Sequence, residues 1–329
     1  MSPSALSYYC CPVCRSPGLD VTGATTEGPD QSIWAGQLIC RQCAASFVVA
    51  HGIPRFVGDE GYAGSFGFQW NRFRKTQLDS YTGLALSEDR LFLVTQWPRT
   101  MKNCVVLEAG SGAGRFTEVL LKSGATVFSF DLSNAVDANA ANNAHDANLN
   151  LFQASIYNIP LLEGIFDRVL CLGVLQHTPD PARSFGSLVR YLKPGGEIAV
   201  DVYARNLRSL LQWKYVLRPI TTRMRKDRLF KLVECAVRIL LPFAILMRRF
   251  GPWAGRLIPI LQYSHWGLPL ELNREWALLD TFDMYSPAHD HPRSLAQVRQ
   301  WLESAGLENV VVTYGPNGVI ARGRRPFPN

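Results

Sequence analysis

Short apolar runs recur through the middle of the chain and predict buried strands. Residues 104–107, CVVL, form an uninterrupted apolar run, which suits a parallel strand covered on both faces. Comparable runs follow at 125–130, 150–155, 166–173 and 192–202. Later in the chain, residues 294–305 predict a helix with Leu295, Val298 and Leu302 on one face. The pattern therefore predicts an α/β domain.

A glycine-rich turn follows the first of these strands. Gly110, Gly112 and Gly114 follow Glu108 at every second position, and residues 115–120 read as the start of a helix. A strand, a glycine turn and a helix in this order typically place a nucleotide at the helix N-terminus. The dinucleotide fingerprint needs a small residue at the position that Arg115 occupies, so NAD is disfavoured.

The ExGxGxG pattern from Glu108 to Gly114 resembles motif I of the class I S-adenosylmethionine (SAM) methyltransferases, with a methyltransferase type 11-like order of later motifs. The second strand ends at Asp131, where the resemblance implies a carboxylate that accepts both ribose hydroxyls of SAM. The family often has Asp at the position of Ser155, in the adenine-binding turn. The resemblance implies a Rossmann-like, seven-stranded fold that closes with a hairpin over 310–314 and 318–321. It also implies SAM contacts from Glu108, Gly110, Gly112, Gly114, Asp131, Leu132, Ser155, Ile156 and Gly173.

Two CxxC pairs near the start of the chain predict a metal site. Cys11 and Cys14 form one pair, and Cys40 and Cys43 form the other. Two such turns supply the four thiolates of a tetrahedral zinc ion, and a closed site of this kind is structural rather than catalytic. Cys10 is a neighbour that competes for the metal. The segment resembles the small zinc ribbon of some methyltransferases and is expected to end near residue 57.

A basic segment follows the fifth strand and predicts an inserted helical region. Residues 229–247 are apolar apart from a polar stripe of Lys231, Glu234 and Arg238, and we expect Pro242 to interrupt them. The run is too short and too charged for a membrane span. The positive charges over 206–260 are Arg208, Lys214, Arg218, Arg223, Arg225, Lys226, Arg228, Lys231, Arg238, Arg248, Arg249 and Arg256.

Three interpretations of this insert stay open. It is a helical cap over the active site, or a basic amphipathic surface that touches anionic lipid or reaches a lipid-linked acceptor, or a face that follows RNA phosphates. The RNA interpretation is less favoured, because the basic residues are interleaved with Leu, Ile and Val rather than with stacking aromatics.

Further candidate residues flank the sheet. The aromatic segment 66–73 predicts either a lid over the cofactor or a helix that simply packs on the sheet. An oxygen nucleophile gains from a base, for which His177, His289 and His291 are candidates, with Asp290 as an orienting carboxylate.

These observations combine into one prediction of organisation and function. We expect a zinc ribbon over 1–57, a lid and SAM-binding core over 58–205, a helical cap over 206–275 and completion of the sheet over 276–329. The formal charge of +7 permits a polyanionic partner without requiring one. The first residues show no secretory signal, so we expect a cytoplasmic location, with peripheral membrane contact as an option.

The predicted reaction is methyl transfer from SAM to a small molecule or glycoconjugate, at oxygen. An RNA or tRNA methyltransferase is the alternative enzyme, and a non-catalytic SAM-binding or scaffold protein is the alternative of another class. The sequence leaves the oligomeric state open.

Overall fold

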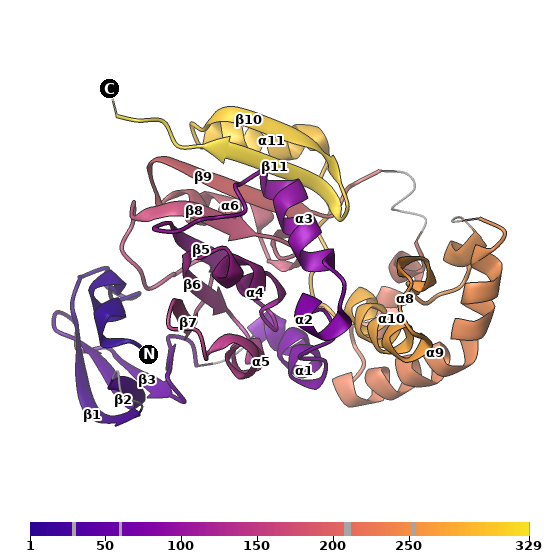
Figure 1. The fold of residues 1–329 in the computed structure, drawn as a ribbon, viewed down its shortest axis with the longest axis horizontal. Coiled ribbons are helices and arrows are strands. Elements are labelled where there is room, and N and C mark those ends of the chain that lie inside the picture. Colours follow the sequence, from indigo (N-terminus) through magenta and orange to yellow (C-terminus); the bar gives the residue numbers. More distant parts are fainter. Residues whose placement is uncertain (28–30, 59–60, 207–211, 252–253, 329) are drawn as a thin grey trace.

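One continuous sheet carries the fold (Figure 1). The computed structural model describes residues 1–27, 31–58, 61–206, 212–251 and 254–328. Within these residues the sheet has eleven strands, in the order β1 (Leu19–Glu27), β2 (Ser32–Cys40), β3 (Ser46–Ala50), β4 (Ile53–Arg55), β7 (Leu149–Gln153), β6 (Thr126–Asp131), β5 (Val105–Ala109), β8 (Phe166–Cys171), β9 (Leu192–Val202), β11 (Gly318–Arg324) and β10 (Glu308–Gly315).

The seven strands from β7 to β10 confirm the predicted Rossmann-like arrangement. Strands β7, β6, β5, β8 and β9 are parallel, and β11 and β10 close the sheet in antiparallel pairing. Helices α4 (Arg115–Lys122), α5 (Ala135–Asn143) and α6 (Pro181–Val189) connect the parallel strands. Parallel pairing puts the carboxyl ends of β5, β6, β8 and β9 at one edge, where ligands bind in such sheets.

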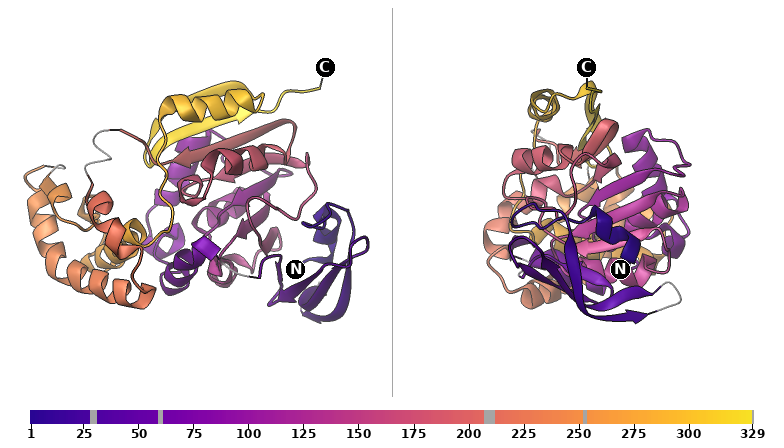
Figure 2. Two further views of the ribbon diagram at one scale, coloured as in Figure 1. Left: turned by 180° about the vertical axis from the view of Figure 1, so that it is seen from behind. Right: turned by 90° about the vertical axis from the view of Figure 1, so that its left-hand side faces the viewer.

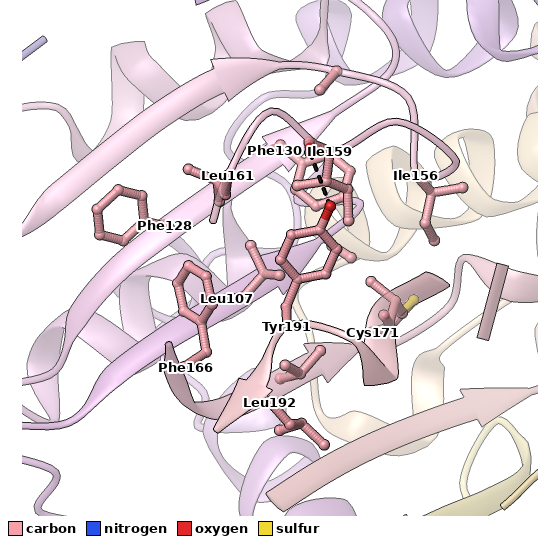
Figure 3. Close-up of a cluster of buried hydrophobic side chains, with 14 of the residues drawn as sticks. Leu107, Phe128, Phe130, Ile156, Ile159, Leu161, Phe166, Cys171, Tyr191 and Leu192 are labelled. Atoms are coloured by element: carbon pink, nitrogen blue, oxygen red, sulfur yellow. Dashed lines mark hydrogen bonds between the residues drawn. The ribbon is translucent and has the colours of Figure 1, made fainter. Parts of the chain in front are cut away.

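Apolar side chains fill both faces of this sheet. On one face, α3 (Leu86–Thr95) and α4 pack against β5 and β6 through Leu91, Leu120 and Val127. On the other face, α6 and α11 (Leu295–Ser304) cover a larger cluster. Figure 3 shows part of this second cluster, where the Tyr191 hydroxyl donates a hydrogen bond of 2.9 Å to the Ile159 carbonyl.

The ribbon extends the sheet instead of standing apart from it, which the sequence did not indicate. Strand β4 pairs in parallel with β7 at Arg55 and Gln153. The Arg55 guanidinium donates to Gln153 Oε1 at 2.9 Å and forms an ion pair with Asp137 at 2.5 Å. The ribbon is therefore bonded to the edge of the sheet through both main-chain and side-chain contacts.

A helical cap lies at the end of the molecule opposite the ribbon (Figures 1 and 2). It contains α8 (Trp213–Thr221), α9 (Lys226–Arg248), the short helix η4 (Ala254–Leu257) and α10 (Leu270–Tyr285). Helix α10 spans the expected boundary at residue 275 and packs against α9. Arg208, which the sequence placed in this insert, lies outside the described residues.

Pro242 does not interrupt the apolar helix, so that expectation is wrong. Helix α9 runs without a break from Lys226 to Arg248 with Pro242 inside it. A proline in a helix removes one main-chain hydrogen bond. Here Leu241 and Ala244, on both sides of Pro242, are buried in the cluster that α9 shares with α10, and this packing holds the helix together.

Candidate functional site

A large cavity lies between the carboxyl edge of the sheet and the cap. Its volume is 1630 Å³, which exceeds the roughly 300–1000 Å³ of a typical single-ligand pocket. The space is therefore large enough for two ligands side by side. Its sheet-side wall contains Gly110, Ser111, Gly112, Ala113, Phe130, Asp131, Leu132, Ala154, Ile156, Gly173 and Val174.

The glycine turn between β5 and α4 needs its glycines for two separate reasons. Gly110, Gly112 and Gly114 have positive φ angles of 77°, 52° and 88°, a region that favours glycine. A Cβ at Gly110 would lie 2.3 Å from the Val174 side chain, and a Cβ at Gly114 would lie 2.2 Å from Asn139 Oδ1. The turn therefore presents bare main chain to the cavity.

Asp131 closes β6 beside this turn and faces the cavity. Its Oδ2 accepts a hydrogen bond from the Gly112 N–H at 3.0 Å, and its Oδ1 accepts from the N–H and the hydroxyl of Ser133 at 2.9 and 2.8 Å. Burial raises the pKa of Asp131, while these hydrogen bonds lower it. A carboxylate has about four lone-pair sites, so Asp131 retains acceptor capacity toward a ligand.

The other sequence-predicted cofactor residues divide into two groups. Leu132, Ile156 and Gly173 line the cavity. Ser155 is absent from its described lining, and its hydroxyl accepts a hydrogen bond from the Tyr157 N–H at 3.3 Å.

Glu108 lies behind the glycine turn and is also absent from the described lining of the cavity. Its Oε2 accepts hydrogen bonds from the hydroxyls of Thr117 and Ser129 at 2.5 and 2.7 Å. Its Oε1 has no hydrogen-bond partner among the described residues. Burial raises the pKa of Glu108 to about 7.

Helix α1 (Gly64–Arg72) covers the cavity with aromatic side chains. Phe66 and Trp70 line it, and the Trp70 indole would lie 3.1 Å from a Cβ at Gly112. The polar neighbours of Trp70 point elsewhere: Gln69 donates to Asp283, and Asn71 donates to the carbonyls of Gly67 and Asn134. The helix thus covers the glycine turn and also packs against the cap.

His177 faces the same cavity from the segment after β8. Its ring is buried between Phe66 and Tyr203, with ring centroids 5.1 and 5.3 Å away. His177 Nδ1 lies 3.0 Å from the His289 carbonyl, so the hydrogen bond requires the proton on Nδ1. This leaves the Nε2 lone pair free, and burial lowers the pKa of His177.

The other candidate residues lie to one side of His177. His289 and His291 stack at 5.5 Å and line a separate small groove of 370 Å³. Asp290 lines both spaces and forms a buried ion pair of 2.8 Å with Lys214. The structure therefore places His177 and Asp290, but neither His289 nor His291, on the described wall of the large cavity.

Comparison with known proteins agrees with this geometry. Residues 107–200 match the family described as a methyltransferase domain. The Ubiquinone biosynthesis O-methyltransferase of Coxiella burnetii is 33% identical over 114 residues, which cover 34% of this chain and 49% of that protein. Residues 107–200 are therefore a methyltransferase domain.

Other similar proteins extend over more of the chain. The uncharacterized protein syc1184_c of Synechococcus is 27% identical over 214 residues, covering 61% of this chain and 46% of that protein. A solved structure of an O-methyltransferase family protein from Burkholderia thailandensis aligns with 79% of this chain and 64% of its own, at 15% identity and a TM-score of 0.45. The chain spans about half the length of the curated relatives it matches.

The cap adds a polar wall opposite the methyltransferase domain that sequence reasoning missed. Asp280 on α10 accepts hydrogen bonds from the Tyr263 hydroxyl, from Trp276 Nε1 at 2.9 Å and from Gln77 Nε2 at 3.0 Å. Burial raises the pKa of Asp280 to about 6. Asp283 lies one helical turn further along and also lines the cavity. The signal in the sequence that could have revealed this wall is the pair Asp280 and Asp283, two carboxylates three residues apart on one helix.

The four predicted cysteines come together within the ribbon. The Sγ atoms of Cys11, Cys14, Cys40 and Cys43 all lie within 4.8 Å of one another. The N–H groups of Val13 and Gln42 donate to the sulfurs of Cys11 and Cys40, each at 3.4 Å. Cys10 points away and donates to the Leu161 carbonyl at 3.1 Å. Four sulfurs in one cluster fit a tetrahedral zinc ion.

Proposed function

We propose that this protein is an enzyme that transfers the methyl group of SAM to an oxygen atom of a small molecule. One observation carries the proposal: the glycine turn, Asp131 and His177 share a single cavity that is large enough for a cofactor and an acceptor. The name of the Coxiella relative supports oxygen as the accepting atom.

The sheet-side wall suits SAM in size and chemistry. The Asp131 carboxylate would accept hydrogen bonds from the two ribose hydroxyls, and the bare main chain of Gly110 and Gly112 would let the ribose and amino-acid parts approach closely. Leu132 and Ile156 supply apolar surface to the adenine. Glu108 and Ser155 are not part of the described lining and would support the site indirectly. Glu108 lies behind the turn, and Ser155 lies in the loop after β7. SAM supplies a methyl group that the sulfonium already activates.

The protein then mainly aligns the acceptor and handles one proton. Correct alignment lowers the activation barrier by roughly 7–11 kcal/mol. His177 Nε2 would accept the hydroxyl proton of the acceptor, and the Nδ1 hydrogen bond to the His289 carbonyl holds the ring in place. The lowered pKa of His177 keeps the imidazole neutral and able to act as a base.

The lining of the outer part of the cavity favours an acceptor with an apolar body. On the cap side, Ile258, Ile260, Trp266 and Met284 line the cavity, while Tyr203, whose ring lies 5.3 Å from that of His177, and Asp283 provide polar atoms. A small molecule with a hydroxyl group and an apolar skeleton matches this distribution, whereas a large glycoconjugate needs much more polar contact surface. Helix α1 excludes water above the reacting atoms through Phe66 and Trp70.

We further infer that Cys11, Cys14, Cys40 and Cys43 hold one structural zinc ion. The four thiolates fill all four positions of a tetrahedral ion, so no position stays open for a substrate.

The proposal is tested by incubation with methyl-labelled SAM and separate pools of small molecules, lipid extract and RNA. We expect label in a small molecule, in a base-stable methyl ether. Label only in RNA would overturn the substrate class. Tight SAM binding without transfer to any pool would instead support a non-catalytic SAM-binding protein.

A further inference from the structure

Helix α9 has two apolar faces, and only one of them is covered. Its buried face packs into the core of the cap through Leu229, Phe230, Val233, Val237, Leu241 and Ala244. A second set of large apolar side chains points to solvent. Its members and exposed fractions are Leu232 (54%), Ile239 (57%), Phe243 (58%), Leu246 (51%) and, just past the helix end, Phe250 (69%).

These five side chains form one straight line, which we call the outer stripe. They lie 7, 11, 14 and 18 positions after Leu232, and each of these spacings returns to nearly the same side of an α-helix. A contiguous apolar patch of this kind on a soluble protein usually marks an interaction surface. Helix α9 forms the outer border of the cap, at the opposite end of the molecule from the ribbon (Figure 1).

Positive charges border the outer stripe along one side. Lys231, Arg238 and Arg249 are exposed and lie 7 and 11 positions apart, so they share one flank of the helix. None of the three forms an ion pair within the described part of the chain. The exposed acids nearby are few: Asp227 is paired with Arg225, and Glu234 lies further around the helix.

We propose that the outer stripe and its basic flank bind the surface of an anionic lipid bilayer, with α9 lying in the plane of the membrane. An apolar line next to a row of cations fits a boundary at which acyl chains adjoin anionic head groups. None of the helices in the described residues has the length and apolarity that a bilayer span requires.

The position of the outer stripe also relates it to the cavity. Its last member, Phe250, lies two residues after Arg248, which lines the cavity. The short helix η4 packs against α9 and carries Leu257, which is exposed and also lines the cavity. The Trp213 indole donates to the Leu257 carbonyl at 3.0 Å and is itself partly exposed. The bound bilayer therefore adjoins the rim of the cavity.

This inference rests on the exposed surface alone and does not require methyl transfer. The test is co-flotation of the full chain with vesicles of phosphatidylglycerol and phosphatidylcholine, and with vesicles of phosphatidylcholine only. We expect binding to the anionic vesicles at low salt, weaker binding to the neutral ones, and loss of binding as salt rises. Protein that stays with neither vesicle at low salt would overturn the proposal.

Two pairs of variants separate the apolar contribution from the charge contribution. Ile239→Ser with Phe243→Ser should weaken vesicle binding at least about tenfold, whereas Tyr314→Ser, an aromatic of equal exposure (57%) on β10, should not. Lys231→Glu with Arg238→Glu should weaken it at least about tenfold, whereas Lys102→Glu with Arg299→Glu, an equal charge change elsewhere, should not. Equal losses in the controls would contradict a defined surface.

A second copy of the chain is the competing occupant. Analytical ultracentrifugation that finds a dimer, dissociated by Ile239→Ser with Phe243→Ser, would overturn the lipid assignment. SAM titration of the same variants keeps the two proposals apart, because the outer stripe does not line the cavity. Lipid binding without SAM binding would reject the proposed function and leave this inference standing.

Discussion

The guanidinium of Arg15, next to Cys14 of the four-cysteine cluster, donates a hydrogen bond of 2.7 Å to the main-chain carbonyl of Ile159. The same guanidinium reaches the Leu161 carbonyl at 3.0 Å. Ile159 lies three residues after Ile156, which lines the cavity. The ribbon thus holds the loop after β7, and so we expect it to support the adenine side of the cofactor site.

Removal of this contact should affect both stability and cofactor binding. We expect Arg15→Ala to lower the free energy of unfolding by about 1–3 kcal/mol, because hydrogen bonds from a charged donor to the Ile159 and Leu161 carbonyls, and to Glu163 and Tyr191, are lost. SAM affinity should fall as well, because the loop loses its support. Urea unfolding and calorimetry measure the two effects. Arg41→Ala, which removes an exposed ion pair with Asp20 on the same ribbon, is the control and should change neither.

The zinc assignment predicts a difference between two neighbouring kinds of cysteine. Protein prepared without chelators should contain one zinc ion per chain by metal analysis, and Cys40→Ser should lose most of it. Cys10→Ser should retain the metal, because Cys10 Sγ points to the Leu161 carbonyl and away from the cluster. Full zinc content in Cys40→Ser would contradict the four-thiolate site.

The role of His177 predicts a loss in turnover without a loss in cofactor affinity. His177→Asn retains a donor toward the His289 carbonyl but lacks the Nε2 base, so kcat should fall about 100-fold to 10,000-fold. Wild-type kcat/KM should stay constant through pH 7 and fall only below the usual histidine pKa of about 6.5, since burial lowers the pKa of His177. His291→Asn, outside the described lining of the large cavity, is the matched control. A fall in SAM affinity equal to the fall in kcat would contradict the assignment.

Glu108 predicts an unusual pH dependence of stability. Its pKa is about 7 in the folded protein and about 4.3 in an unfolded chain, so the folded state binds more protons between these values. Stability should therefore decrease as pH rises from about 4.3 through 7. Glu108→Gln should remove the part of this dependence that comes from Glu108, leave the smaller part from Asp280, and be more stable than wild type at pH 8 by on the order of a few kcal/mol. A free-energy difference between wild type and Glu108→Gln that stays the same at every pH would contradict this assignment.

The local motifs could be predicted because each depends on a short stretch of chain. The glycine turn and Asp131 follow from apolar runs and backbone sterics within residues 104–131. Likewise, the helix predicted over 294–305 is α11, and the capping box between Ser294 and Gln297 that begins it lies within one turn. No tertiary contact is needed to recognise such features.

The remaining features depend on contacts between distant segments, which a single sequence does not encode locally. Gln69 meets Asp283, and Gln77 meets Asp280, each across more than 200 residues. The polar wall of the cavity therefore exists only after the cap has packed on α1. The apolar run 229–247 likewise did not show which of its large side chains would face solvent; in the structure these are Leu232, Ile239, Phe243 and Leu246.

SAM titration of the wild type and of Asp131→Ala, by isothermal calorimetry, tests the central claim most directly. We predict one binding site per chain, and an affinity about 2 kcal/mol weaker in the variant, because the carboxylate that accepts the ribose hydroxyls is gone. Asp146→Ala, which removes a carboxylate that caps the Asn148 N–H away from the cavity, should bind SAM as the wild type does. Absence of SAM binding by the wild type, or equal affinity in Asp131→Ala, would contradict the account.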